Sequence, residues 1–74
     1  MYYIRSPKWR GWFVVVLANG EFNSSLPSHV GATSFLTMES AILALVKNCK
    51  GGNLSLNDYE IVKVVHTPTY QVVF

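Results

Sequence analysis

The sequence predicts an α+β domain: a small antiparallel sheet of four to five strands with one helix on one face, in the order β-β-β-α-β-β. Short runs rich in β-branched and aromatic residues occur on both sides of a single stretch with helical spacing. Turn-forming residues separate these runs. The chain has 74 residues and no internal repeat or low-complexity segment, so residues 1–74 are expected to form a single domain.

The first two strands are predicted at residues 2–5 and 12–18. Aromatic and β-branched residues favour the first strand, and the loop at residues 6–11 contains Pro7 and Gly11. The run at 12–18 is apolar without alternation, which is typical of a strand covered on both faces. We therefore expect this run to lie inside the sheet.

A hairpin is expected to follow at Asn19-Gly20. This dipeptide suits the positive φ angles of a type I′ turn, so residues 21–23 should return as a short third strand. Residues 24–34 are polar and include Pro27 and Gly31. They predict an irregular surface connection.

The single helix is predicted to run from about residue 38 to residue 50. Thr37 suits the N-cap, Glu39 favours the positive end of the helix dipole, and Gly51-Gly52 supplies the stop. Apolar residues repeat at helical spacing along one face: Met38, Ile42, Leu45, Val46 and Cys49.

Two more strands are predicted at residues 59–66 and 70–74, with a turn at 67–69 between them. Alternation places apolar side chains on both sides of strand 59–66, and one helix can cover only one of these sides. We therefore expect a second molecule to cover the other side. The final strand is apolar, so it is expected either to be central in the sheet or to pair across a dimer.

The composition also favours association. Half of the residues are hydrophobic and only 14% are charged, compared with about 25% in an average soluble domain. Cys49 is the only cysteine, so no internal disulfide can contribute to stability. A homo-oligomer or a stable complex with another protein is therefore expected.

The N-terminal region superficially resembles a secretory signal, because basic residues precede the apolar run at 12–18. The run is short, rich in β-branched and aromatic residues, and followed by no small-residue cleavage site. It is also much shorter than the roughly 20 residues that span a bilayer. We interpret it as a buried strand, and expect a cytoplasmic protein with no membrane partner.

The chain offers little catalytic or metal-binding chemistry. Its four carboxylates form no recognisable acid/base pair, and Cys49 lies on the apolar stripe of the helix. His29, His66 and Cys49 match no zinc spacing. We therefore expect a protein that is not an enzyme, with no catalytic residue, metal ligand or cofactor site.

A binding constellation is present near the N-terminus: Arg5, Lys8, Trp9, Arg10 and Trp12. Basic side chains neutralise phosphates and tryptophan stacks on bases, which suits nucleic acid. Tryptophan and arginine are also enriched at the centres of protein interfaces. Simple packing of these residues against the sheet is the third interpretation.

Several segments resemble small accessory proteins of tailed phages: residues 11–15, residues 18–21, Phe35-Leu36-Thr37 with Glu39 and Ala41, and residues 59–64. The resemblance implies an early product that blocks a host protein by occlusion, in the host cytoplasm, without a catalytic set. The predicted function is therefore a protein-binding module, with a host protein as the expected partner. The alternatives are a small basic nucleic-acid-binding protein, or a dimer whose cleft holds a nucleotide-like ligand.

Overall fold

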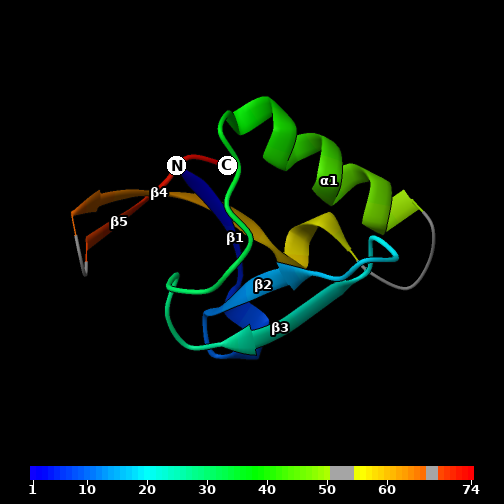
Figure 1. Ribbon diagram of the computed structural model, residues 1–74, viewed down its shortest axis with the longest axis horizontal. Helices are drawn as coiled ribbons and strands as arrows, with labels where there is room; N and C mark the ends of the chain where they lie inside the picture. The colour runs from blue at the N-terminus through cyan, green and yellow to red at the C-terminus, as the bar shows by residue number, and fades with distance from the viewer. Residues whose placement is uncertain (51–54, 67–68) are drawn as a thin grey trace.

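The computed structural model describes residues 1–50, 55–66 and 69–74, and contains one helix and a five-stranded antiparallel sheet (Figure 1). The chain runs through β1 (Tyr2–Ser6), β2 (Trp12–Val16), β3 (Phe22–Leu26), α1 (Met38–Lys50), β4 (Glu60–His66) and β5 (Thr69–Val72). Short 3-10 helices occupy Pro7–Trp9 and Leu56–Asp58. This order confirms the predicted α+β fold and its sequence of elements.

The strands lie in the spatial order β3-β2-β1-β4-β5, so β1 is central and β3 and β5 form the two edges. The predicted final strand is therefore an edge strand of the sheet. Tyr2 lies opposite Lys63 and Arg5 opposite Glu60 in the pairing of β1 with β4. This register decides which side chains share a face.

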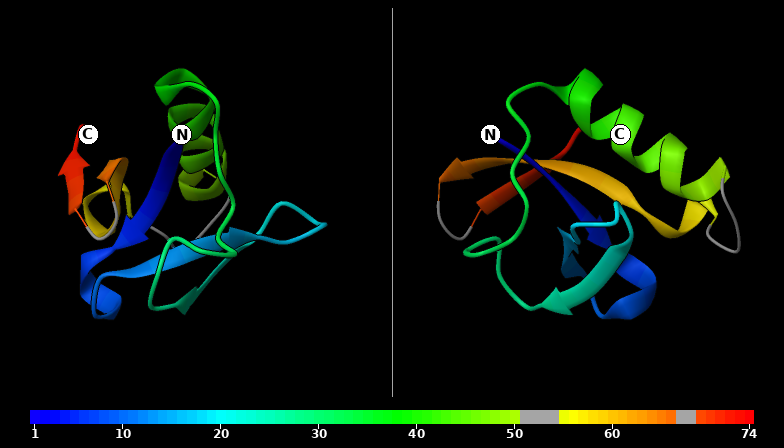
Figure 2. Two further views of the ribbon diagram at one scale, coloured as in Figure 1. Left: turned by 60° about the vertical axis from the view of Figure 1, so that its left-hand side comes forward. Right: turned by 45° about the vertical axis from the view of Figure 1, so that its right-hand side comes forward.

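Helix α1 covers one face of the sheet (Figure 2) and begins and ends where the sequence predicts. The Oγ1 of Thr37 accepts a hydrogen bond from the Ser40 backbone N–H at 3.1 Å, as expected of an N-cap. The predicted Gly51-Gly52 stop lies outside the described residues, as does most of the predicted turn at 67–69.

The core beneath the helix is aliphatic. Its fully buried members come from three strands and the helix: Ile4, Val14, Ile61, Ala41 and Leu45. Val46, predicted to lie on the buried stripe, is 41% exposed, and Ala41 is buried instead. Because residue 46 is turned about 100° from residue 45 on a helix, it lies beside the buried stripe and not within it.

The face opposite the helix is covered in part by the chain itself. Phe13 and Val62 are buried there, and the imidazole of His29, from the connection after β3, lies 5.2 Å from the Tyr3 ring and 5.6 Å from the Tyr70 ring between centroids. The expectation that a second molecule must shield this face was therefore wrong for its centre. Sequence periodicity could not place the connection there, because its residues are polar.

The connection continues between β1 and β2, which diverge after pairing at Arg5–Phe13 and Ser6–Trp12. The Thr33 N–H donates to the Val14 carbonyl oxygen at 3.2 Å, and the Val16 N–H donates to Thr33 Oγ1 at 2.8 Å. Tyr2 and Phe35 exchange backbone hydrogen bonds on the β1 side. Residues 33–35 therefore occupy the gap between the strands.

The β2–β3 hairpin forms where it was predicted, but β3 continues to Leu26 instead of ending at residue 23, and the turn is of a different type. The Gly20 N–H donates to the Leu17 carbonyl oxygen at 2.8 Å, and Gly20 has a φ of 87°. Asn19 is not among the residues with positive φ, so the turn is not type I′. The Asn48 side-chain amide also donates to the Gly20 carbonyl oxygen at 2.7 Å, which ties the end of α1 to this turn.

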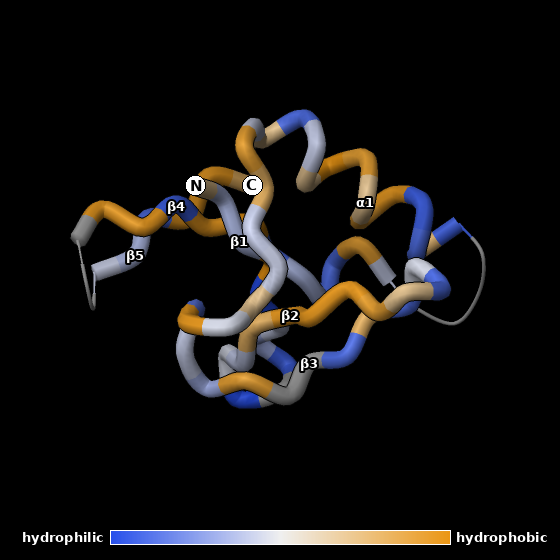
Figure 3. Tube along the Cα trace, in the orientation of Figure 1, coloured by the Kyte–Doolittle hydropathy of each residue, from blue (hydrophilic) through white to orange (hydrophobic). Residues whose placement is uncertain are grey.

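Hydropathy along the trace matches this arrangement (Figure 3). Strand β2 is hydrophobic along its length, whereas the neighbouring edge strand β3 is mixed. No helix among the described residues is long and apolar enough to cross a membrane.

Candidate interaction surface

The predicted binding residues lie on β1, on β2 and on the connection between them. Pro7 occupies the first turn of the 3-10 helix, where its missing N–H has no helical partner to lose. The 3-10 helix ends at Trp9 and is capped by Arg10 (φ 62°, ψ 21°), which is followed by Gly11 with a φ of 70°. The Gly11 N–H donates back to the Ser6 carbonyl oxygen at 3.0 Å and closes the loop.

The loop is fixed through Ser6 to the 3-10 helix at Leu56–Asp58, which precedes β4. This side chain is fully buried, and its hydroxyl donates to the Asp58 backbone carbonyl oxygen at 3.2 Å. A buried hydroxyl that lacks a partner costs about 1–3 kcal/mol, so this bond fixes the base of the loop. The residues beyond Ser6 are therefore presented on an ordered support.

Arg5 does not contribute its charge to the surface. Its Nε donates to Glu60 Oε1 at 2.6 Å, and the two side chains are only 23% and 21% exposed. The guanidinium also lies over the rings of Phe13 and Tyr70, with the Cζ atom 6.0 and 5.8 Å from their centroids. Arg5 thus packs on the sheet face opposite α1 and neutralises a carboxylate of the same chain.

Lys8 and Arg10 lie at the surface, on either side of Trp9. The Lys8 Nζ is 3.8 Å from Asp58 Oδ2, and the lysine side chain is 65% exposed, so this ion pair is loose and weak. Arg10 is exposed as well. The side chain of Trp9 lies outside the described part of the molecule, as does that of His66.

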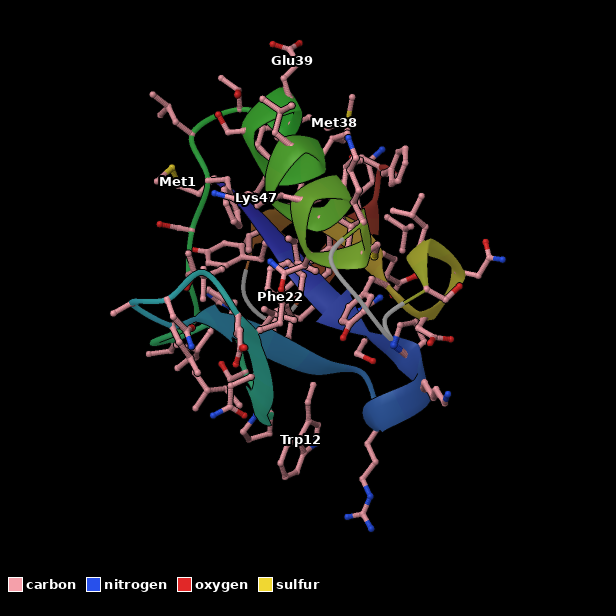
Figure 4. All side chains as sticks on the ribbon, turned by 90° about the vertical axis from the view of Figure 1, so that its right-hand side faces the viewer. Met1, Trp12, Phe22, Met38, Glu39 and Lys47 are labelled. Atoms are coloured by element: carbon pink, nitrogen blue, oxygen red, sulfur yellow. The ribbon has the colours of Figure 1, made fainter. Side chains whose placement is uncertain are left out.

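Trp12 opens β2 and is partly exposed. Its indole points away from α1 and from the rest of the molecule (Figure 4). Lys8, Arg10 and Trp12 lie within five positions of the chain and none of them is buried. We treat them as one candidate surface, which we call the basic loop surface.

A second constellation was not predicted from the sequence. His29 Nδ1 lies 2.9 Å from the Tyr70 hydroxyl, within hydrogen-bond distance, and the ring centroids of Phe13 and Tyr70 are 5.1 Å apart. His29 and Tyr70 are 41 residues apart in the chain, so only the fold brings them together. We call Tyr3, Phe13, His29 and Tyr70 the aromatic cluster.

Cys49 packs at the edge of the helix-side core and is partly buried. Burial raises the pKa of its thiol, and the negative charge of Asp58 raises that pKa further. The reactive thiolate is therefore disfavoured at neutral pH. Within the described residues, no group of three or more His, Cys, Asp or Glu side chains is arranged to hold a metal ion.

Comparison with protein-family models, with curated proteins and with solved structures finds no match to this chain. Functional inference therefore depends on the geometry of its own residues.

Proposed function

We propose that this protein is a non-catalytic protein-binding module that contacts an acidic surface of its partner through the basic loop surface. The resemblance to phage accessory proteins suggests a host protein as the partner, blocked by occlusion. Arg10 supplies the central charge, Lys8 a second charge, and Trp12 an apolar anchor. Tryptophan and arginine are residue types that commonly dominate interface energetics.

The observation that carries the proposal is the backbone conformation of Arg10. Its φ of 62° lies in the left-handed region, where a residue with a Cβ is strained and glycine is favoured. Such strain costs on the order of 1 kcal/mol, and strained residues cluster at functional sites. An exposed arginine at this position contributes a charge to the surface in spite of that cost.

The basic side chains near the loop differ in how tightly they are paired within the chain, and this difference supports the proposal. Arg5 is taken up by Glu60, and Lys8 is only loosely held by Asp58. The charge that is left therefore gathers on the outer part of the loop, next to Trp12. Carboxylates on a partner would complement it, and a shallow apolar pocket would receive the indole.

The test compares Arg10→Gly with Lys63→Gln, which removes the same charge from an exposed lysine on β4. Each tagged protein is incubated with nuclease-treated bacterial lysate, and bound proteins are quantified by mass spectrometry. We expect one protein whose recovery falls at least tenfold with Arg10→Gly and with Trp12→Ala but is unchanged with Lys63→Gln. Its affinity is then measured with the purified partner.

Unfolding measurements separate this result from misfolding. Because glycine relieves the strain, Arg10→Gly should unfold at the same or higher denaturant concentration than the parent chain, up to about 1 kcal/mol more stable. Equal capture by the parent chain and Arg10→Gly would overturn the proposal. So would binding only to nucleic acid, recognised by an affinity that falls steeply with added salt.

A further inference from the structure

The two edges of the sheet differ in how they are protected against pairing with another strand. Edge strand β3 contains Asn23-Ser24-Ser25, is followed by Pro27, and has a register irregularity in its pairing with β2 between Phe13 and Val14. Charged side chains, prolines and bulges are the features that normally block edge pairing. The β3 edge is therefore protected toward its C-terminal end.

Edge strand β5 also follows a proline, Pro68, and its pairing with β4 has a register irregularity between Val64 and His66, but residues 70–72 lie beyond both. Tyr70, Gln71 and Val72 carry no charge and no proline, and they pair in continuous register with Val64, Lys63 and Val62. Two apolar side chains at this end of the strand are exposed, Val72 at 51% and Phe74 at 52%. An uncharged edge of this kind is a template for another strand.

The pattern of hydrogen bonds shows which groups face outward. The Val73 N–H donates inward to the Ile61 carbonyl oxygen at 2.8 Å, and the Phe74 carbonyl oxygen accepts from the Ile61 N–H at 3.3 Å. Because alternate residues of an antiparallel strand direct their backbone groups to opposite edges, Gln71 also faces β4. The N–H and C=O groups of Tyr70 and Val72 therefore face the outer edge.

We propose that β5 pairs with β5 of a second copy of this chain, antiparallel and about a two-fold axis beside Gln71. Tyr70 then lies opposite Val72 of the second copy, and each pair exchanges both of its backbone hydrogen bonds. A register centred on Val72 would use Phe74, whose carbonyl oxygen is already bonded to Ile61. A register centred on Tyr70 would carry Val72 past Thr69, where β5 begins.

The charge and the length of the β5 edge bear on the choice of a second copy as the partner and on the strength of the pairing. A second copy brings the same uncharged edge, so no like charges meet along the paired strands. A stable interface covers about 800 Å² of each partner, which is about one sixth of the 4774 Å² accessible surface of this chain. A four-residue strand is only about 13 Å long, so the dimer is expected to be reversible and concentration-dependent. This contact is separate from the basic loop surface and does not depend on the proposed function.

Val72→Pro gives the sharpest test, because it removes an outward N–H while leaving the pairing of Gln71 with Lys63 intact. The two-fold axis doubles the loss to two hydrogen bonds, so we expect about a 30-fold weaker dimer by sedimentation equilibrium. Gln71→Glu places like charges opposite each other and should weaken it about fivefold. Asn23→Glu, the matched change on β3, should leave it unchanged.

Disulfide trapping tests the register directly. Opposed residues at the axis have Cα atoms about 4.5 Å apart, within the range that a disulfide spans. In a Cys49→Ala background, Gln71→Cys should form a covalent dimer on mild oxidation, and Asn23→Cys should not. A parent chain that stays monomeric at all concentrations, or equal trapping at both positions, would overturn the proposal.

Discussion

Beneath α1, the sheet is covered by an aliphatic core whose members are fully buried, with Leu45 and Ala41 of the helix packed on Ile4, Val14 and Ile61. On the opposite face, the His29 imidazole of the connection packs on the rings of Tyr3, Phe13 and Tyr70, and the Arg5 guanidinium lies over two of these rings. The first face is held by non-directional apolar burial, and the second by oriented ring contacts and an ion pair.

This difference has a consequence for stability. Apolar burial scales with area, so the helix side should carry most of the free energy of folding. The cover on the other side is held by few contacts, because His29 is only partly buried and the neighbouring Val30 is 71% exposed. Regions with few buried apolar contacts open locally at a lower free-energy cost than the whole domain.

The largest expected effect is on the helix side. Leu45→Ala removes a fully buried side chain and leaves a cavity, which should lower the free energy of unfolding by about 2–5 kcal/mol. Because small domains are only marginally stable, this change is expected to unfold a large fraction of the protein. Leu43→Ala, at a position 68% exposed on the same helix, should change stability by less than about 0.5 kcal/mol. Denaturant unfolding followed by circular dichroism measures both.

A smaller effect is expected on the opposite face. His29→Ala removes the contact with the Tyr70 hydroxyl and three ring contacts, and should cost about 1–2 kcal/mol. Val30→Ala, at a neighbouring position 71% exposed, is the matched control. Hydrogen exchange should also become faster at the Thr33 amide, which bonds to Val14, more than at the Ile61 amide. Equal losses from Leu45→Ala and His29→Ala would contradict the comparison.

The part of the fold that the sequence predicts is the part that depends on local signals. The bounds of α1 follow from the apolar repeat and the Thr37 cap, and both are properties of neighbouring residues. The β2–β3 hairpin was predicted from Asn19-Gly20, but its turn type was wrong, because Gly20 alone takes the positive φ. Local composition thus predicted where this turn lies, but not its backbone geometry.

The features of the fold that the sequence does not predict depend on contacts between residues far apart in the chain. Arg5 and Glu60 are 55 residues apart, and their pairing follows from the register of β1 with β4. The segment 24–34 reads as an exposed loop, yet its first residues form the end of β3, His29 covers part of one face, and Thr33 fills the gap between β1 and β2. The clustering of basic residues in the loop could be predicted from the sequence. That Arg5 would instead pair with Glu60 on the sheet could not.

The smallest expected effect concerns Cys49, at the edge of the helix-side core. Its thiol has a pKa above the ordinary value, chiefly through burial and secondly through the charge of Asp58. A raised pKa means that the folded state holds the proton more tightly than the unfolded state does. The contribution to stability is therefore complete below the ordinary thiol pKa of about 8.5 and is lost as the pH rises through the folded value.

Comparison with Cys49→Ala isolates this contribution from other groups that titrate at alkaline pH. We expect the free energy of unfolding of the parent chain to fall relative to that of Cys49→Ala as the pH rises above about 8.5, the ordinary pKa of a thiol. Iodoacetamide should also alkylate the native thiol more slowly than the thiol of the unfolded chain, because the thiolate is the nucleophile. If the two stability profiles run parallel, Cys49 ionises as freely in the folded chain as in water. The edge of the helix-side core would then be as open to solvent as the partly covered face opposite, and the contrast between the two faces would be confined to the centre of the sheet.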